Sequence, residues 1–147
     1  MIVVGTEFET PDDDYILNFV RLMLKAMLIA GLGGFVGTSL RFLTGKLCQM
    51  ISVGAFPLGT FAVNIIGSFI IGILFGLAEK TNIISPQLNV LLITGFCGGF
   101  TTFSSFADDM FLLLQQRHFM QFGLYAGASF VLGLVLVWVG RSIVRAA

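Results

Sequence analysis

The group of residues best suited to bind an ion lies between residues 95 and 106, where the sequence reads GFCGGFTTFSSF. Two adjacent glycines, Gly98 and Gly99, are followed by four hydroxyl residues within a few positions, and neither feature favours a continuous helix. Thr and Ser are also preferred first residues of a new helix. The pattern therefore predicts a helix that is broken here, with backbone polar groups and hydroxyls free to contact an ion.

Such a break would provide two kinds of ion ligand. The first half-helix would end in unpaired carbonyls near Gly98 and Thr101, which favour cations, and the second would begin with unpaired N–H groups near Thr102, which favour anions. Three phenylalanines follow at three-residue spacing: Phe100, Phe103 and Phe106. The edge of an aromatic ring is electropositive, so these rings either face an anion with their edges or pack in the core.

Two other apolar segments carry polar stripes. Residues spaced by four share one face of a helix. One such set is Thr60, Asn64, Ser68, Gly72 and Gly76, and a second is Tyr125, Ser129 and Gly133. An amide or hydroxyl in the middle of a bilayer is costly without partners. Asn64 is therefore predicted either to join helices through hydrogen bonds or to line an ion path.

The first apolar segment carries Gly33, Gly37 and Arg41 at four-residue spacing. Glycines in this pattern usually mark close packing of helices in a membrane. Arg41 lies toward the end of the segment. Its side chain is predicted either to reach the lipid headgroups or to form a positive vestibule that attracts anions.

The composition explains which solvent these segments need. Of the 147 residues, 56% are hydrophobic and only 11% are charged, whereas a soluble domain carries about 25% charged residues. The mean hydropathy is +0.97, so most of the chain must lie in lipid. The net charge is zero, which gives no reason to expect a nucleic-acid partner. Cys48 and Cys97 are interpreted as free thiols.

The apolar residues form four segments, and each is long enough to cross a membrane, which takes about 20 residues. They cover residues 22–45, 57–78, 88–114 and 119–140. The long runs do not alternate, which excludes a β-barrel. The sequence therefore predicts an all-α membrane protein with four transmembrane helices in a domain from 22 to 147. Residues 1–21 are predicted to be an N-terminal extension, disordered or interfacial, with Met23 and Met27 as alternative starts.

The basic residues give little asymmetry between the two membrane sides. One side would carry Arg21, Lys25, Lys80, Arg141 and Arg145, and the other Arg41, Lys46 and Arg117. Such a weak bias permits a chain that inserts in both directions. The chain is then expected either to form an antiparallel, dual-topology homodimer or to adopt a single orientation set by the lipid.

The middle of the spans carries no ionisable side chain, since Asp108 and Asp109 fall in the outer part of the third segment and His118 falls in a loop. A proton-coupled carrier usually needs a carboxylate within the membrane. No nucleophile–base pair or metal-binding cluster is apparent. The chain is therefore predicted not to be an enzyme.

Three motifs resemble those of the CrcB/Fluc fluoride channels. They are GGFVGTSLRF at residues 33–42, GTFAVNIIGSF at 59–69 and GFCGGFTTFSSF at 95–106. The resemblance covers about residues 27–140. In the fourth span it depends on Tyr125 and Ser129 alone, and Ser105 stands where the family often has Thr.

The resemblance implies an antiparallel homodimer with two fluoride pores in a bacterial plasma (inner) membrane. It implies a structural sodium ion at the dimer centre, bound by the backbone carbonyls of Gly98 and Thr101, and a vestibule formed by Arg41. The implied pore residues are Asn64, Phe103, Ser104, Ser105, Phe106, Tyr125 and Ser129. The implied function is passive fluoride export that gives fluoride resistance. The alternatives are a small dual-topology multidrug transporter, which would need a membrane-embedded Glu, and a non-conducting membrane subunit.

Overall fold

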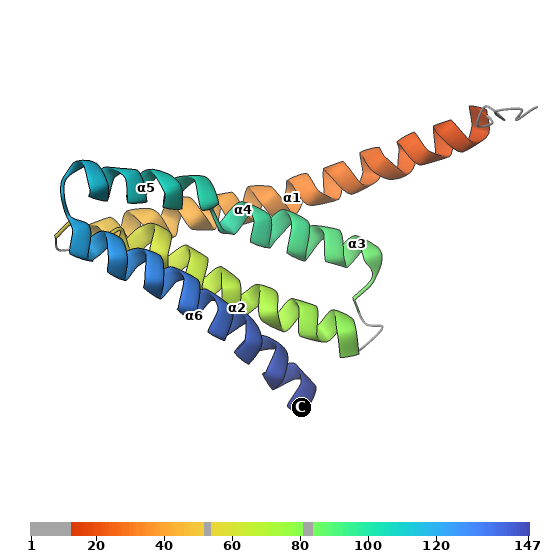
Figure 1. The fold of residues 1–147 in the computed structure, drawn as a ribbon. Coiled ribbons are helices and arrows are strands. Elements are labelled where there is room, and N and C mark those ends of the chain that lie inside the picture. Colours follow the sequence, from red (N-terminus) through yellow and green to blue (C-terminus); the bar gives the residue numbers. More distant parts are fainter. Residues whose placement is uncertain (1–12, 52–53, 81–83) are drawn as a thin grey trace, which may run out of the picture.

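The computed structural model describes residues 13–51, 54–80 and 84–147, and within them every regular element is a helix. Four helical stretches are long and apolar enough to cross a membrane. The predicted all-α fold with four spans is therefore confirmed. The start of α1 and the end of α6 lie toward the same end of the bundle (Figure 1).

Three of the four stretches are single helices: α1 (Asp13–Ile51), α2 (Leu58–Lys80) and α6 (Phe119–Ala146). The remaining stretch, the third along the chain, is composed of α3 (Pro86–Asn89), the π-helix η1 (Val90–Cys97), α4 (Gly98–Phe100) and α5 (Phe103–Gln115). This stretch starts at Pro86 because the Ser85 hydroxyl accepts a hydrogen bond from the Leu88 N–H at 3.2 Å. A capping Ser followed by Pro at the first helical position is a strong start signal.

The helix α1 begins at Asp13, well before the span predicted from residue 22. Residues 13–30 contain neither Gly nor Pro, so nothing in the sequence interrupts the helix. Asp13 and Asp14 lie in its first turn, where negative charge stabilises the helix dipole. Residues 13–21 of the predicted extension are thus helical, and residues 1–12 lie outside the described part of the chain.

Glycines set the closest helix contacts between α2 and α6. A Cβ atom at Gly72 would lie 2.5 Å from the Val137 carbonyl oxygen, and one at Gly140 would lie 2.7 Å from the Phe69 carbonyl oxygen. Helices in lipid associate through van der Waals contact rather than a hydrophobic driving force, so this close approach stabilises the pair.

Glycines also seat the third stretch against α1. A Cβ at Gly95 would lie 2.6 Å from the Ala30 carbonyl oxygen, and one at Gly99 would lie 2.6 Å from the Gly34 carbonyl oxygen. Cβ atoms at Gly33 and Gly37 would likewise meet the Leu91 and Phe96 carbonyl oxygens. The glycine pattern of α1 therefore packs against another helix, as the sequence predicted. These contacts hold α4, and with it the start of α5, at a fixed height along α1.

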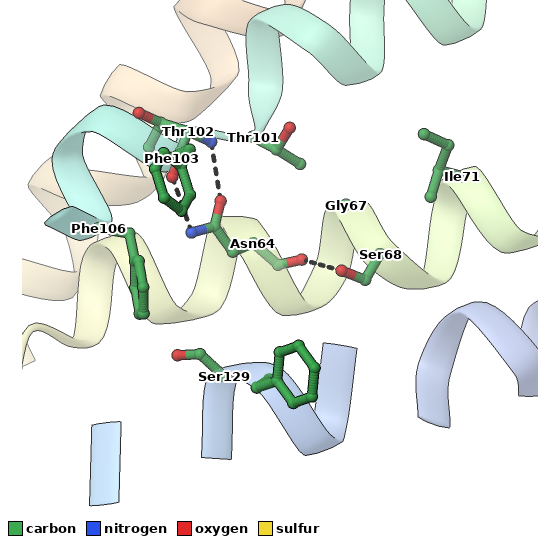
Figure 2. Close-up of a pocket in the computed structure, with 10 residues that line it drawn as sticks. Asn64, Gly67, Ser68, Ile71, Thr101, Thr102, Phe103, Phe106 and Ser129 are labelled. Carbon is green, nitrogen blue, oxygen red and sulfur yellow. Dashed lines mark hydrogen bonds between the residues drawn. The ribbon is translucent and has the colours of Figure 1, made fainter. Parts of the chain in front are cut away.

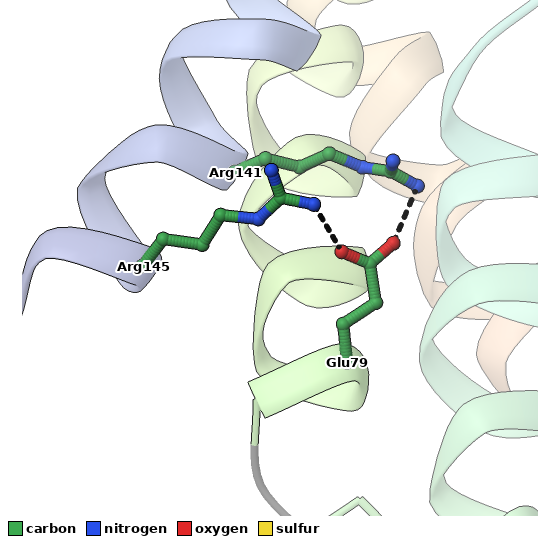
Figure 3. Close-up of polar contacts among 3 residues, drawn as sticks. All are labelled: Glu79, Arg141 and Arg145. Atoms are coloured by element: carbon green, nitrogen blue, oxygen red, sulfur yellow. Dashed lines mark hydrogen bonds and ion pairs between the residues drawn. The ribbon is translucent and has the colours of Figure 1, made fainter.

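A charged cluster joins the C-terminal ends of α2 and α6 (Figure 3). The Glu79 carboxylate contacts Arg141 at 3.1 Å and Arg145 at 2.9 Å. Lys80 donates to the Val144 carbonyl at 3.0 Å, which satisfies one of the free carbonyls at the end of α6. The cluster marks the level at which these two helices leave the apolar region.

Candidate functional site

Two residues of extended backbone separate α4 from α5. Thr101 has φ −83° and ψ 161°, and Thr102 has φ −152° and ψ 123°. In a continuous helix the Thr102 N–H would donate to the Gly98 carbonyl. Here it donates to the Asn64 side chain instead, so the Gly98 carbonyl lacks its helical partner.

The Asn64 side chain pairs with both polar groups of the Thr102 backbone (Figure 2). Its Oδ1 accepts from the Thr102 N–H at 2.8 Å, and its Nδ2 donates to the Thr102 carbonyl at 3.0 Å. An amide nitrogen carries two hydrogens, so one N–H of Asn64 remains for another acceptor. Asn64 thereby fixes α2 to the extended residues and still offers a donor.

The Thr102 hydroxyl caps α5. It accepts from the Ser105 N–H at 3.2 Å and donates to the Ser105 hydroxyl at 3.1 Å, and it lies 3.3 Å from the Ser104 hydroxyl. Ser104 and Ser105 are exposed, whereas Thr102 is buried. The hydroxyl cluster therefore sits at the N-terminal, electropositive end of a helix of 13 residues.

A pocket of about 390 Å³ opens beside this cluster, between α2, α5 and α6 (Figure 2). It brings together four of the predicted pore residues: Asn64, Phe103, Phe106 and Ser129. The Ser129 hydroxyl is buried and has no hydrogen-bond partner among the described residues. It is therefore an available donor. Asn64 and Ser129 come from two different helices and line one space with the two rings.

Tyr125, another predicted pore residue, does not line this pocket. Its side chain is fully buried, its ring centroid lies 5.0 Å from that of Phe106, and its hydroxyl donates to Asp109 Oδ2 at 3.1 Å. Asp109 and Thr60 line a smaller pocket of about 210 Å³. Asp109 was not predicted as a site residue, although its position three residues after Phe106 places both on neighbouring faces of one helix.

Arg41 reaches the extended residues from α1. Its Nη1 donates to the Thr101 carbonyl at 3.2 Å, which is one of the two carbonyls predicted to bind sodium. The described residues contain no cluster of three or more His, Cys, Asp or Glu side chains able to hold a metal. A cation at this place would therefore depend on backbone carbonyls, and it would share the Thr101 carbonyl with a guanidinium.

Four apolar spans with two non-helical residues beside a donor-lined pocket define a multi-pass membrane protein built like a channel or transporter. Residues 28–141 match the family described as CrcB-like protein, Camphor Resistance (CrcB), and the chain belongs to this family. The predicted family resemblance is thus confirmed.

Known relatives agree with this assignment. A protein of Methylobacillus flagellatus is 46% identical over 124 residues, which cover 84% of this chain and 96% of the relative. A protein of Chlorobium phaeobacteroides is 42% identical over 120 residues, which cover 82% of this chain and 93% of the relative. Both relatives carry the name "Fluoride-specific ion channel FluC".

Proposed function

We propose that this chain is a fluoride channel, not an enzyme, which lets fluoride leave a bacterial cell passively through the plasma membrane and so gives fluoride resistance. The names of its relatives support this function. The observation that carries it is the pairing of Asn64 with Thr102, which holds a helix N-terminus and a free amide N–H beside a single pocket.

Fluoride is small and strongly hydrated, so a pore must replace its water with other donors. The pocket offers the second N–H of Asn64 and the unpartnered hydroxyl of Ser129. The rings of Phe103 and Phe106 line the same space, and their edges attract an anion weakly. Because no lining residue carries a full charge, the ion is held loosely enough to move on. Ser104, Ser105 and Tyr125 would extend the fluoride path beyond this pocket.

The functional unit we propose is an antiparallel, dual-topology homodimer with the third span broken inside the membrane. Its support is that the protomer leaves site residues uncovered: Phe103 is 81% exposed. A groove of about 580 Å³ on α1, lined in part by Gly34, Phe35 and Thr38, is also open. A second copy would cover both surfaces and close the pore on its open side.

We further propose a structural sodium ion between the two copies, bound by the carbonyls of Gly98 and Thr101 from each. Unwound carbonyls at the end of a half-helix are a common sodium site in membrane proteins. The Gly98 carbonyl is free of its helical partner because Asn64 binds the Thr102 N–H. Arg41 would have to share the Thr101 carbonyl or move away from it.

The test is fluoride efflux from liposomes that contain only the purified protein. We expect fluoride to leave rapidly when its gradient is released by a cation ionophore, and chloride to leave far more slowly under the same gradient. Absence of fluoride efflux, as for a non-conducting subunit, would overturn the proposal. Equal rates for chloride would overturn its selectivity.

A further inference from the structure

The first part of α1 extends beyond the rest of the bundle. Two hydrogen bonds, Thr38 to the Gly99 carbonyl and Arg41 to the Thr101 carbonyl, show that α1 runs beside the third stretch at an offset of 60 to 61 residues. By this offset Lys25 is level with the first residue of α3. Residues 13–24, here called the overhang, therefore project beyond the start of α3 by about 18 Å, at 1.5 Å per residue. The family match begins only at residue 28.

The overhang is apolar and uncovered by the rest of the described chain (Figure 1). Its exposed large side chains are Tyr15, Ile16, Leu17, Phe19, Val20, Leu22, Met23 and Leu24. The polar headgroup layer is only about 6 Å thick on each side of the hydrocarbon. An overhang that stood upright would thus carry these side chains through the headgroups into water, so something must cover them.

All but one of the charged and amide residues of the overhang and of the next turn lie on one face; the exception is Asp13, the first residue of the helix. Asp14, Asn18, Arg21 and Lys25 are spaced by four, three and four residues, which keeps them on a single narrow stripe of the helix. Large apolar side chains fill the other faces. A helix with a narrow charged stripe and a wide apolar face suits the boundary between acyl chains and headgroups, where Arg21 and Lys25 attract anionic lipids.

Protein cover of the overhang is disfavoured. The C-terminal ends of α2 and α6 carry the Glu79, Arg141 and Arg145 cluster (Figure 3), and Ile143 is the one exposed large apolar residue described in this part of α6. Charged side chains are poor cover for an apolar helix face. In the antiparallel homodimer of the proposed function, on which this step rests, the two overhangs leave from opposite sides of the membrane and cannot cover each other.

We propose that the overhang lies along the membrane surface as an interfacial anchor, with its apolar face in the acyl boundary, its polar stripe toward water and its basic residues on anionic headgroups. The turn falls near Lys25, because residues 13–25 are all exposed and Ala26 is the first residue of α1 that is partly buried. A bend there disturbs no packing inside the chain.

Single-tryptophan proteins test this arrangement. Trp138, which is exposed on α6, is replaced in the full chain by Phe, and one tryptophan is placed on the apolar face (F19W) or on the polar stripe (N18W). Both proteins are reconstituted in vesicles of phosphatidylcholine and phosphatidylglycerol. We expect F19W to emit at shorter wavelength, to be quenched by lipids brominated near the headgroup, and to be protected from acrylamide several-fold. We expect N18W to be quenched mainly by acrylamide.

Three results would overturn the proposal. Equal acrylamide quenching of both proteins would show an overhang that stands in water. Protection of F19W from acrylamide without quenching by brominated lipid would show protein cover, such as a second copy. Strong lipid quenching of both positions would show a fully embedded helix. Since the readout is lipid contact, a failure of fluoride efflux would be seen separately.

Discussion

Replacing Asn64 with Asp changes one atom of the group at the centre of the site. The carboxylate can still accept from the Thr102 N–H, as Asn64 Oδ1 does at 2.8 Å. It loses both N–H donors: the one to the Thr102 carbonyl at 3.0 Å and the one left for an ion. We expect N64D to conduct far less fluoride than either the native protein or N64A.

The magnitudes separate a structural role from a role in conduction. Interhelical hydrogen bonds in membranes average about 0.6 kcal/mol and reach about 1.7 kcal/mol, so N64A, which loses two of them, is destabilised by about 1–3 kcal/mol. A carboxylate about 4 Å from a passing anion opposes it by about 4 kcal/mol at an effective dielectric constant of about 20. That repulsion corresponds to roughly a thousand-fold lower flux. We expect native flux to exceed that of N64A, and N64A to exceed N64D.

The assay is fluoride efflux from liposomes at equal protein content, with gel filtration and thermal unfolding in detergent as checks on folding. Glu79→Gln is the control: it also changes the charge by one unit, but its ion pairs lie about 22 Å away along α2. E79Q should keep native flux. If N64D conducts as well as N64A, Asn64 only holds the extended residues in place and does not face the ion.

Three further variants test neighbouring parts of the site. Phe103→Leu should lower fluoride flux without lowering the protomer's melting temperature, because the ring is 81% exposed; unchanged flux would remove this ring from the pore. Gly140→Ala should lower the melting temperature, since its Cβ would lie 2.7 Å from the Phe69 carbonyl oxygen and overpacking costs about 1–3 kcal/mol; an unchanged value would refute close packing there. Arg41→Gln should retain more sodium than the native protein after gel filtration in sodium-free buffer, measured by atomic emission, because the Arg41 guanidinium no longer occupies the Thr101 carbonyl. Absence of sodium from both proteins would argue against the metal site.

The sequence was sufficient for the four spans because lipid imposes long apolar runs. It was less informative about helix ends. Hydropathy marks the part of a helix that is apolar, whereas a helix continues until a breaker or cap ends it. For this reason α1 begins at Asp13 and α6 continues to Ala146, beyond the spans predicted from 22 and to 140. The π-helical turns of Val90–Cys97 had no signal in the local sequence.

The residue types that form the site were predictable from the sequence, but the hydrogen-bond partners of their side chains were not. Glycines and hydroxyls indicated where regular backbone hydrogen bonding would be weak, and the four-residue stripe placed Asn64 and Ser68 on one face. That Asn64 binds Thr102 rather than another side chain depends on how α2 packs against the third stretch. The bond from Tyr125 to Asp109 was missed for the same reason, since residues 16 positions apart on two helices meet only in the folded chain.

The two interpretations that the sequence left open for Asn64 are compatible in the structure. A side-chain amide has two acceptor positions and two donor hydrogens, and the Thr102 backbone engages one of each. The bonds that tie α2 to the extended residues also orient the remaining N–H, because an amide is planar. A side chain that only joined helices could be replaced by any residue that forms the same two bonds. An amide that also faces an ion needs its second N–H, and no carboxylate can supply it.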